Sequence, residues 1–452
     1  MALLECNSFE LEYSGRSLSI PNLSLDSGDI GLVFGHSDSH VSDFLLTLGG
    51  LINAQTITNP AEEGTLRRSV VQLPKHQLEK ILLDGVSIYA LDPATKAQKV
   101  GFVFDNPELG IFGRNVEEDY LHSLSAAGLE PSKDHTGSHL FRYGLGDRLG
   151  RQTSHLSGGE MQRLNCACAL DRHPLLLVAD FSYSNLDNDF LFDFITWTKK
   201  HCETHGAVAI LAGIDHQQIR YDKMRYFVVD SGAVMRSASA PSWYLGADEQ
   251  RKGLSDLLES RSKSDSTVLS VSNLARFSKK LNRRVTIPAS FEINQGEIHL
   301  LTGANGSGKS TVAQFIVGRS LKHNSTGEFK LGDNVTPVLA PQFPERSFIG
   351  ATVAQEIPDQ QLRRSAGFTE EHDNIDPLQL DRNGRKLLAI ASAIGYSQGL
   401  VILDEPTCGM DFSGKQKFVE LINNHSTLAF LIITHDPALL GLGKITVLEE
   451  SQ

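Results

Sequence analysis

Two versions of one glycine-rich loop constrain this chain more than any other feature. Residues 303–311 read GANGSGKST, in which the glycines, Lys309 and Ser310 have the spacing of a phosphate-binding P-loop. This loop follows the strand-like EIHLLT and opens a helical pattern, which is the context that a P-loop requires. Residues 35–43 read GHSDSHVSD, the same loop without its lysine. We therefore expect two related α/β domains.

The intact loop is expected to bind the phosphates of ATP. Its glycines let successive backbone N–H groups turn toward phosphate oxygens, and the helix N-terminus adds a favourable dipole. Lys309 is expected to reach the β- and γ-phosphates, and the Ser310 hydroxyl to ligate Mg²⁺. The predicted loop contacts are Gly303, Ala304, Asn305, Gly306, Ser307, Gly308, Lys309, Ser310 and Thr311.

Polar residues at strand ends supply the partners that the loop needs. In LVILDEP, Asp404 ends a buried strand and is expected to share Mg²⁺ with Ser310 and Gln342, while Glu405 is the candidate general base for the attacking water. His435 closes the next apolar strand and is expected to contact the γ-phosphate. Gln342 is a candidate for sensing Mg²⁺ or the water.

A second anion-binding helix end is predicted in LSGGEMQRL, residues 156–164. Ser157, Gly158 and Gly159 stand at the start of the helix that runs through CACAL, and bare glycine backbone lets a phosphate approach closely. Phe277 has two interpretations, an aromatic that stacks on adenine or a core aromatic.

This set of motifs resembles the ATP-binding-cassette (ABC) ATPases over essentially the whole chain, twice. The resemblance implies an α/β fold of two P-loop NTPase domains in tandem. Each is expected to have a mostly parallel core sheet, an N-terminal antiparallel β subdomain and a helical subdomain. The cofactors are expected to be ATP and Mg²⁺.

Short apolar runs fit the buried strands of such sheets. The runs at 175–180, 400–405 and 428–436 end in charged or turn residues, and helical patterns at 311–321 and 385–394 lie between strands. The Ser-rich stretch 259–270 lacks a hydrophobic face and is the predicted linker. The predicted domains are 1–258, which supplies LSGGE, and 271–452, which is catalytically competent.

Composition narrows the function classes. The formal net charge of −12 argues against a nucleic-acid surface, because phosphate binding usually requires clustered Lys and Arg. Five cysteines in no disulfide or zinc spacing indicate a reducing compartment. The longest apolar runs fall short of the roughly 20 residues that cross a bilayer, and the N-terminus does not resemble a signal peptide.

The first half lacks the chemistry of the second. Its lysine position holds a valine, and an aspartate and a histidine replace two glycines of the loop. An acidic residue stands at the position of Gln342, and apolar residues stand at those of the base glutamate and the switch histidine. Two unit charges about 4 Å apart interact by roughly 4 kcal/mol at an effective dielectric near 20, so an aspartate in the loop repels a triphosphate. Only the strand-end acid Asp180 remains. The degenerate positions are Asp38, His40, Val41, Asp105, Phe181 and Ile214.

The second half has the opposite defect. Its segment matching LSGGE is LDRNG, where Asp381, Arg382 and Asn383 replace Ser-Gly-Gly. In the ABC family, two domains pack head to tail, and each site combines one P-loop with the other domain's signature. Under that geometry every intact part falls into one composite site, and every replaced part into the other.

The segments 103–119 and 340–356 align at constant register, and they resemble the loop-and-short-helix segments of energy-coupling-factor (ECF) importers. That resemblance implies integral-membrane partners, a coupling protein and a substrate-binding subunit, with one chain per transporter at the cytoplasmic face of the membrane. The alternatives are a soluble tandem ATPase acting on ribosomes or DNA, and an ATP-binding regulatory protein. The aligned pairs are Pro107 with Pro344, Glu108 with Glu345, Gly113 with Gly350 and Val116 with Val353.

Overall fold

The computed structural model divides into two units, Met1–Tyr244 and Leu245–Gln452. Each unit is described by itself below. The structure describes residues 2–13, 16–36, 39–51, 79–130, 133–181, 186, 188–213, 221–230, 233–241, 244–259, 261, 264–278, 283–284, 286–304, 307–318 and 325–448.

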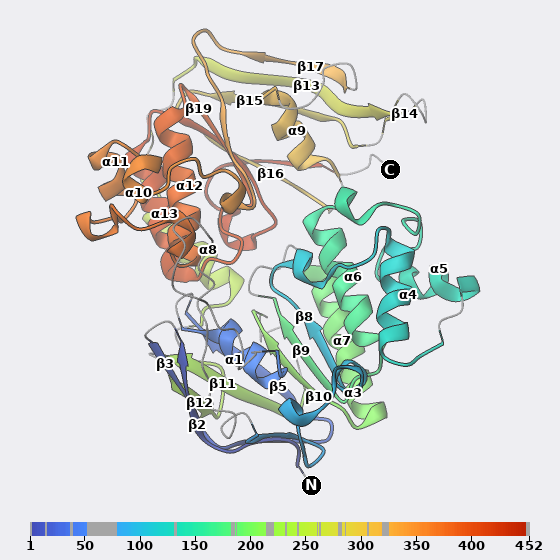
Figure 1. The fold of residues 1–452 in the computed structure, drawn as a ribbon. Coiled ribbons are helices and arrows are strands. Elements are labelled where there is room, and N and C mark those ends of the chain that lie inside the picture. Colours follow the sequence, from blue (N-terminus) through green and yellow to red (C-terminus); the bar gives the residue numbers. More distant parts are fainter. Residues whose placement is uncertain are drawn as a thin grey trace. The chain divides into compact units, whose positions relative to one another are not determined.

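The first unit is built on one mixed sheet whose centre is parallel (Figure 1). In spatial order its strands are β2 (Phe9–Tyr13), β3 (Arg16–Ile20), β12 (Ala233–Ser237), β11 (Met224–Asp230), β5 (Ile30–Gly35), β10 (Val208–Ala212), β9 (Leu176–Asp180) and β8 (Val100–Val103). An antiparallel sheet contains β4 (Leu23–Asp26), β1 (Ala2–Cys6), β6 (Ile81–Leu83) and β7 (Val86–Ser87).

Alternate residues of the central strands enter two separate cores, because successive side chains of a strand point to opposite faces. Leu177 and Ala179 of β9 pack with the helices α4 (Val116–Ala126), α6 (Gly158–Leu170) and α7 (Asn188–His205). Leu176 and Val178 pack instead with α1 (Val41–Leu48) and the antiparallel sheet. The prediction of strands buried on both faces is confirmed. The unit also contains α3 (Pro93–Lys99) and α5 (Lys133–Phe141).

The second unit repeats this plan. Its parallel sheet has the order β18 (Val338–Ala340), β19 (Leu400–Asp404), β20 (Ala429–Ile433), β16 (Ile298–Gly303) and β21 (Lys444–Leu448). The antiparallel sheet is formed by β14 (Arg283–Arg284), β13 (Thr267–Ser278), β15 (Ala289–Asn294) and β17 (Ser325–Leu331). The helices are α8 (Ala247–Leu257), α9 (Lys309–Ile316), α10 (Val353–Glu356), α11 (Gln360–Ser365), α12 (Arg382–Tyr396) and α13 (Phe412–Asn424).

Matching strand orders support the predicted duplication. The run β8-β9-β10-β5-β11 of the first unit corresponds in chain order to β18-β19-β20-β16-β21 of the second. The aligned loops also have one construction. Asp119 accepts the backbone N–H groups of Phe112 and Gly113 at 2.7 and 2.6 Å. Glu356 accepts those of Ile349 and Gly350, both at 2.8 Å.

The division between the units lies before the predicted linker. Helix α8, which the sequence analysis assigned to the first domain, packs on α13 and on the 3₁₀ turn Pro437–Leu439 of the second unit, and its Leu254 is fully buried. Arg261, inside the predicted linker, donates to the carbonyls of Gly296, Ile422, His425 and Leu428 at 2.7 to 3.2 Å. These contacts join residues 245–261 to the second unit.

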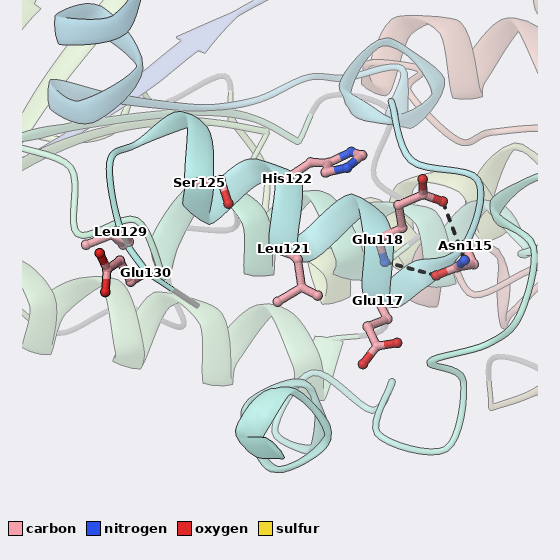
Figure 2. Close-up of a pocket in the computed structure, with 8 residues that line it drawn as sticks. All are labelled: Asn115, Glu117, Glu118, Leu121, His122, Ser125, Leu129 and Glu130. Atoms are coloured by element: carbon pink, nitrogen blue, oxygen red, sulfur yellow. Dashed lines mark hydrogen bonds between the residues drawn. The ribbon is translucent and has the colours of Figure 1, made fainter. Parts of the chain in front are cut away.

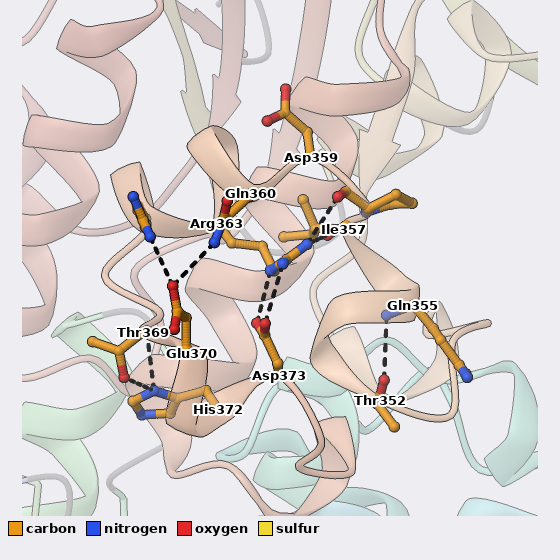
Figure 3. Close-up of polar contacts among 12 residues, drawn as sticks. Thr352, Gln355, Ile357, Asp359, Gln360, Arg363, Thr369, Glu370, His372 and Asp373 are labelled. Atoms are coloured by element: carbon orange, nitrogen blue, oxygen red, sulfur yellow. Dashed lines mark hydrogen bonds and ion pairs between the residues drawn. The ribbon is translucent and has the colours of Figure 1, made fainter.

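A buried arginine organises the short helices of the second unit. Arg363 donates to the carbonyls of Ile357 and Pro358 at 2.6 and 2.9 Å, and its Nε lies 2.9 Å from Asp373 (Figure 3). The pair is nearly buried on the arginine side, where a charge requires several partners. A polar network therefore fixes a region whose helices are only one or two turns long.

Within the ranges given above, none of the helices combines the length and apolar content that a membrane crossing requires.

Candidate nucleotide site

The P-loop of the second unit connects β16 to α9 through two glycines in left-handed conformations. Gly303 has φ 139° and Gly308 has φ 110°, values that side-chain-bearing residues rarely adopt. A Cβ at Gly308 would also lie 2.5 Å from Cβ of Thr286. Of the other predicted contacts, Ala304 is exposed, Ser307 is buried, Ser310 and Thr311 are half-buried, and Asn305 and Gly306 lie outside the described residues.

Lys309 is buried against its own loop. Its ammonium donates to the carbonyls of Gly303 and Ala304 at 2.8 and 3.0 Å. This places the only positive charge of the loop at its centre, where anionic phosphate oxygens would replace the carbonyls as partners.

The two predicted magnesium ligands from different elements meet. Ser310 at the start of α9 donates to Asp404 at the end of β19, with 3.2 Å between the oxygens. Both Ser310 and Asp404 offer oxygen donors of the type that Mg²⁺ prefers, so they fit the ion. Burial raises the pKa of Asp404, and its hydrogen bond with Ser310 opposes that shift.

Glu405 and His435 also lie together. The backbone N–H of His435 donates to the Glu405 carboxyl at 3.3 Å, and the His435 ring Nε2 lies 3.8 Å from the other carboxyl oxygen. Burial, and then the charge of Asp404, raise the pKa of Glu405 to about 8. Glu405 has φ 49°, a conformation that is uncommon for such residues. A nearly buried carboxyl with a raised pKa suits proton transfer near neutral pH.

Lys386 was not among the site residues predicted from the sequence. This lysine of α12 is buried, and its ammonium donates to the backbone carbonyls of Gln342 and Glu405 at 2.7 and 2.9 Å. It therefore joins the segments that carry two predicted site residues. Burial lowers the pKa of Lys386, and nearby acidic groups oppose that shift. In the alignment of the two signature segments, Gln162 of LSGGEMQRL matches Lys386. A polar residue at this position in both halves is the sequence signal that could have identified Lys386. In the structure Gln162 donates to the Phe104 carbonyl at 2.9 Å.

Phe277 and Gln342 are the remaining predicted residues of this half. Phe277 is half-buried on β13, opposite Arg284 of β14. Gln342 is half-buried just after β18, and its backbone carbonyl is held by Lys386 as described above.

The described part of the first unit's loop shares one backbone feature with the P-loop and lacks its cation. His40 stands in place of Gly308 and also has a positive φ, 64°, and its ring Nδ1 lies 2.8 Å from Asp43. Val41 packs inward, where a Cβ at Gly35 would lie 2.5 Å from it. Asp38 and Ile214 lie outside the described residues.

Other positions of the first unit either retain or replace the site residues of the second unit. Ser42 donates to Asp180 at 2.5 Å, the counterpart of the Ser310–Asp404 contact. Phe181, in place of the glutamate, is buried against Phe194. Asp105 is half-buried and accepts the backbone N–H of its neighbour at 2.7 Å. Among the residues that the structure describes at the end of β9, Phe181 thus stands where the second unit has its candidate general base.

The two signature helices begin differently. Ser157 caps α6 with a neutral hydroxyl that accepts from Glu160 N–H at 3.2 Å, and Glu160 accepts in return from Ser157 N–H at 2.8 Å. Ser157 is exposed, Gly158 is half-buried and Gly159 is buried. In the second unit the carboxylate of Asp381 caps α12 by accepting from Gly384 N–H at 2.8 Å. A helix end that already carries a carboxylate disfavours a phosphate.

Asn383, which replaces a glycine of the signature, points away from the helix end. Its amide turns toward α13 and donates to Asp411 at 2.9 Å, so it occupies space beside Gly414. The negative charge of Asp381 is therefore one difference from the LSGGE helix end, and the side chain of Arg382 in place of a glycine is another.

An open pocket of about 720 Å³ along α4 is a poor nucleotide site (Figure 2). Its lining includes Glu117, Glu118 and Glu130, together with Leu121 and His122. Three acidic side chains repel a triphosphate, and the pocket contains neither P-loop.

The fold and this constellation define a tandem pair of P-loop nucleoside triphosphatase units. The sequence profile described as ABC transporter matches residues 63–181 and 287–408, which together make up more than half of the chain. The chain belongs to this family, and its units are ABC ATPase domains.

Relatives from distant organisms carry names of the same kind. A Bifidobacterium longum protein, named as an ABC transporter ATP-binding protein, is 24% identical over 84% of this chain and 58% of its own length. A protein of similar name from Methanosarcina mazei is 23% identical over 93% of this chain and 87% of its own. The chain thus spans little more than half of the Bifidobacterium protein.

Solved structures share the tandem fold. The RNase-L Inhibitor matches with a TM-score of 0.58 and 16% identity, over 97% of this chain and 87% of its own. Archaeal ABCE1, in a model of its ribosome-bound form with Pelota, matches with a TM-score of 0.62 and 14% identity, over 98% of this chain and 76% of its own. At this identity the likeness concerns the fold.

Proposed function

We propose that this chain hydrolyses ATP at one composite site and uses the reaction to drive transport of a small molecule or metal ion across a membrane, most simply uptake. The composite site would be formed by the N-terminus of α6, capped by Ser157, and by groups of the second unit. Those groups are the P-loop, Asp404, Glu405 and His435. The second pairing, Val41 with Asp381, would be inactive. The observation that carries the proposal is this segregation: the neutral signature cap occurs in one unit and the cationic loop in the other.

Each residue has a role that its geometry supports. Lys309 would neutralise the β- and γ-phosphates, and Ser310 and Asp404, with Gln342, would hold Mg²⁺, which screens phosphate charge when bound. Glu405 would accept the proton of the attacking water, and His435 beside it would contact the γ-phosphate. Lys386 would hold the backbone segments that carry Glu405 and Gln342 in fixed positions through its bonds to their carbonyls.

Coupling to a membrane protein is supported by a groove of about 490 Å³ in the second unit. It lies between β18 and α12 and is lined by Pro341, Gly350 and Tyr396 among others. Ile349 at its edge is 95% exposed, and its aligned counterpart Phe112 is 85% exposed. We infer that a helix of an integral-membrane coupling protein docks over the exposed apolar side chains of Ile349 and Phe112, as the ECF resemblance implies. The chain would then lie at the cytoplasmic face, with one copy per transporter.

A second candidate is action on the ribosome. The structural likeness to ribosome-bound ABCE1 favours it at the level of fold. The net charge of −12 and the exposed apolar tips favour the membrane partner.

The composite site is tested by exchanging the two caps. Ser157→Asp keeps a good N-cap but adds the charge found at Asp381, so steady-state ATPase activity of the full chain should fall by at least about tenfold. Asp381→Ser and Val41→Lys are the matched controls and should leave turnover near the wild-type rate. A Ser157→Asp protein with unchanged turnover contradicts the shared site.

The partner is tested by photo-crosslinking in the native cell. A crosslinking residue at Ile349 or Phe112 should capture an integral-membrane protein, whereas one at the equally exposed Phe141 should not. Capture of a ribosomal protein instead would support the second candidate.

A further inference from the structure

Three histidines of the first unit lie together away from the nucleotide loops. His173 lies in the turn between α6 and β9, and His201 and His205 lie four residues apart on the last turns of α7. One ring nitrogen from each falls within 4.8 Å of the other two. The ring centroids of His201 and His205 are 4.6 Å apart, and those of His173 and His205 are 4.9 Å apart.

Hydrogen bonds select the nitrogen that each helix histidine leaves open. His201 Nε2 lies 2.8 Å from the Pro174 carbonyl, which can only accept, so Nε2 carries the proton and Nδ1 has the lone pair. Thr204 donates its hydroxyl proton to the Lys200 carbonyl at 2.8 Å. His205 Nδ1 lies 2.9 Å from that same hydroxyl oxygen and therefore donates to it, which leaves Nε2 with the lone pair.

This pattern is typical of metal-ligating histidines. Such residues donate their second ring N–H to a carbonyl or another oxygen, which fixes the tautomer and the ring orientation. His201 is buried and anchored, while His173 and His205 are exposed, so an ion has a path from solvent.

The third histidine is held in place by an unusual backbone. His173 has φ 53° and precedes Pro174, and its N–H donates to the Leu170 carbonyl at 3.0 Å. A left-handed residue other than glycine has a conformational cost, and such residues concentrate at functional positions. This turn directs a third imidazole toward the two on α7.

The cluster consists of imidazoles alone. Asp171 is occupied by Arg142 and by the hydroxyls of Tyr120 and Tyr143, so it is not counted as a ligand.

We propose that His173, His201 and His205 bind a divalent transition-metal ion, Zn²⁺ in the first instance, with water as the fourth ligand. Imidazole ligands suit Zn²⁺, which binds histidine nitrogen at about 2.0–2.1 Å. The three rings are stacked at interplanar angles of 19° to 27°, so binding requires the exposed His173 and His205 rings to rotate until their lone pairs meet at one ion. The bound ion ties the end of α7 to the turn that leads into β9.

The second unit does not repeat the three histidines at the matching positions. Val208 N–H bonds the Leu175 carbonyl, and the matching bond of the second unit joins Ala429 to Gly399. These bonds align Leu175 with Gly399 and Val208 with Ala429. At the same sequence distances from these residues, Ser397 matches His173, Ile422 matches His201 and Ser426 matches His205.

The test is calorimetric titration of Zn²⁺ into metal-free full-length protein without nucleotide. The variants are His173→Asn, which tolerates the left-handed backbone, and His205→Gln, on an exposed helix end. We expect wild type to bind one more equivalent than either variant, or to bind it at least about tenfold more tightly. The exposed His135→Gln is the matched control and should bind like wild type.

A second readout is thermal unfolding, because an ion that binds the folded state raises Tm. Zn²⁺ should raise the Tm of wild type and of His135→Gln, and raise it less for the other two variants. Equal Zn²⁺ binding and equal Tm shifts in all four folded proteins would overturn the proposal.

Discussion

Glu405 shows how the surroundings of one carboxyl decide what it can do. The residue follows Asp404 directly, yet the two acids have different partners: Asp404 contacts the Ser310 hydroxyl, while Glu405 contacts His435. The raised pKa, about 8, follows from burial and from the adjacent charge. Sequence reasoning identified both acids because they end a buried strand, and this geometry agrees with the different roles assigned to them.

Replacing the proposed base should stop turnover without removing the nucleotide. We expect Glu405→Gln to lower kcat by about 10² to 10⁴, because the amide cannot accept the water proton. ATP binding, measured with a fluorescent analogue, should persist. Glu371→Gln, an exposed substitution in the same unit, is the control. Turnover near the wild-type rate in Glu405→Gln would remove Glu405 from the proposed mechanism.

The buried lysine gives a second prediction at this scale. In Lys386→Met the carbonyls of Gln342 and Glu405 lose their donor, and leaving such groups unpaired costs about 1–3 kcal/mol. The free energy of unfolding and the ATPase rate should both fall. Lys386→Gln should retain more of both, because its amide can still donate to one of these carbonyls; Gln162, at the matching position of the first unit, donates to the Phe104 carbonyl. Denaturant titration and a phosphate-release assay measure these effects, and equal behaviour of the two variants would contradict them.

Elements differ in how readily the sequence predicts them. The strands β9, β19 and β20 were predicted because each is a short apolar run buried on both faces. Helix α12 was also predicted, but its cap was not: nothing local indicates that Asn383 turns toward Asp411 while Asp381 caps the helix. The hydrogen-bond partner of a polar side chain depends on which distant segments lie near it in the folded structure, and the local sequence does not show this.

Strand β16 supplies a prediction about pH. His299 of β16 is 4% exposed, lies 2.9 Å from the Thr446 hydroxyl and stacks on Phe291. Burial lowers its pKa from 6.5 to about 4, and Lys444 adds to the shift while Glu297 opposes it. The folded state therefore binds fewer protons than the unfolded state between these values. This stability is present above pH 6.5 and is lost as the pH falls toward 4.

His299→Gln should remove this contribution, because glutamine does not titrate and can still bond the Thr446 hydroxyl. Wild type should lose up to roughly 1.4 kcal/mol per pH unit more than the variant across that window. Urea unfolding at pH 7 and pH 5 compares the two. Parallel losses in both proteins would exclude His299 as the source.

At the scale of the whole molecule, a duplicated fold carries different polar groups in its two halves. The strand orders match, and the Asp119 and Glu356 loops share one construction, so the scaffold is preserved where the chemistry is not. The predicted boundary was less accurate, because α8 and Arg261 pack on the second unit.

Fragments of the second unit test this boundary. A fragment of residues 245–452 should have a higher Tm than one of residues 271–452. The shorter fragment loses the burial of Leu254, about 1.5–3 kcal/mol, and the four carbonyl bonds of Arg261. A fragment starting at residue 259 keeps Arg261 alone and should fall between them. Equal Tm values for all three would show that the segment adds nothing to the unit.

The sequence by itself determined the fold class, the duplication and the residues of the P-loop and its strand-end acids, because these depend on spacing within short segments and on buried apolar runs. Tertiary structure alone decided the role of Lys386, the different helix caps, the unit that α8 joins and the meeting of three histidines. Those features depend on which distant segments become neighbours, and burial gives the polar groups there few partners to choose from.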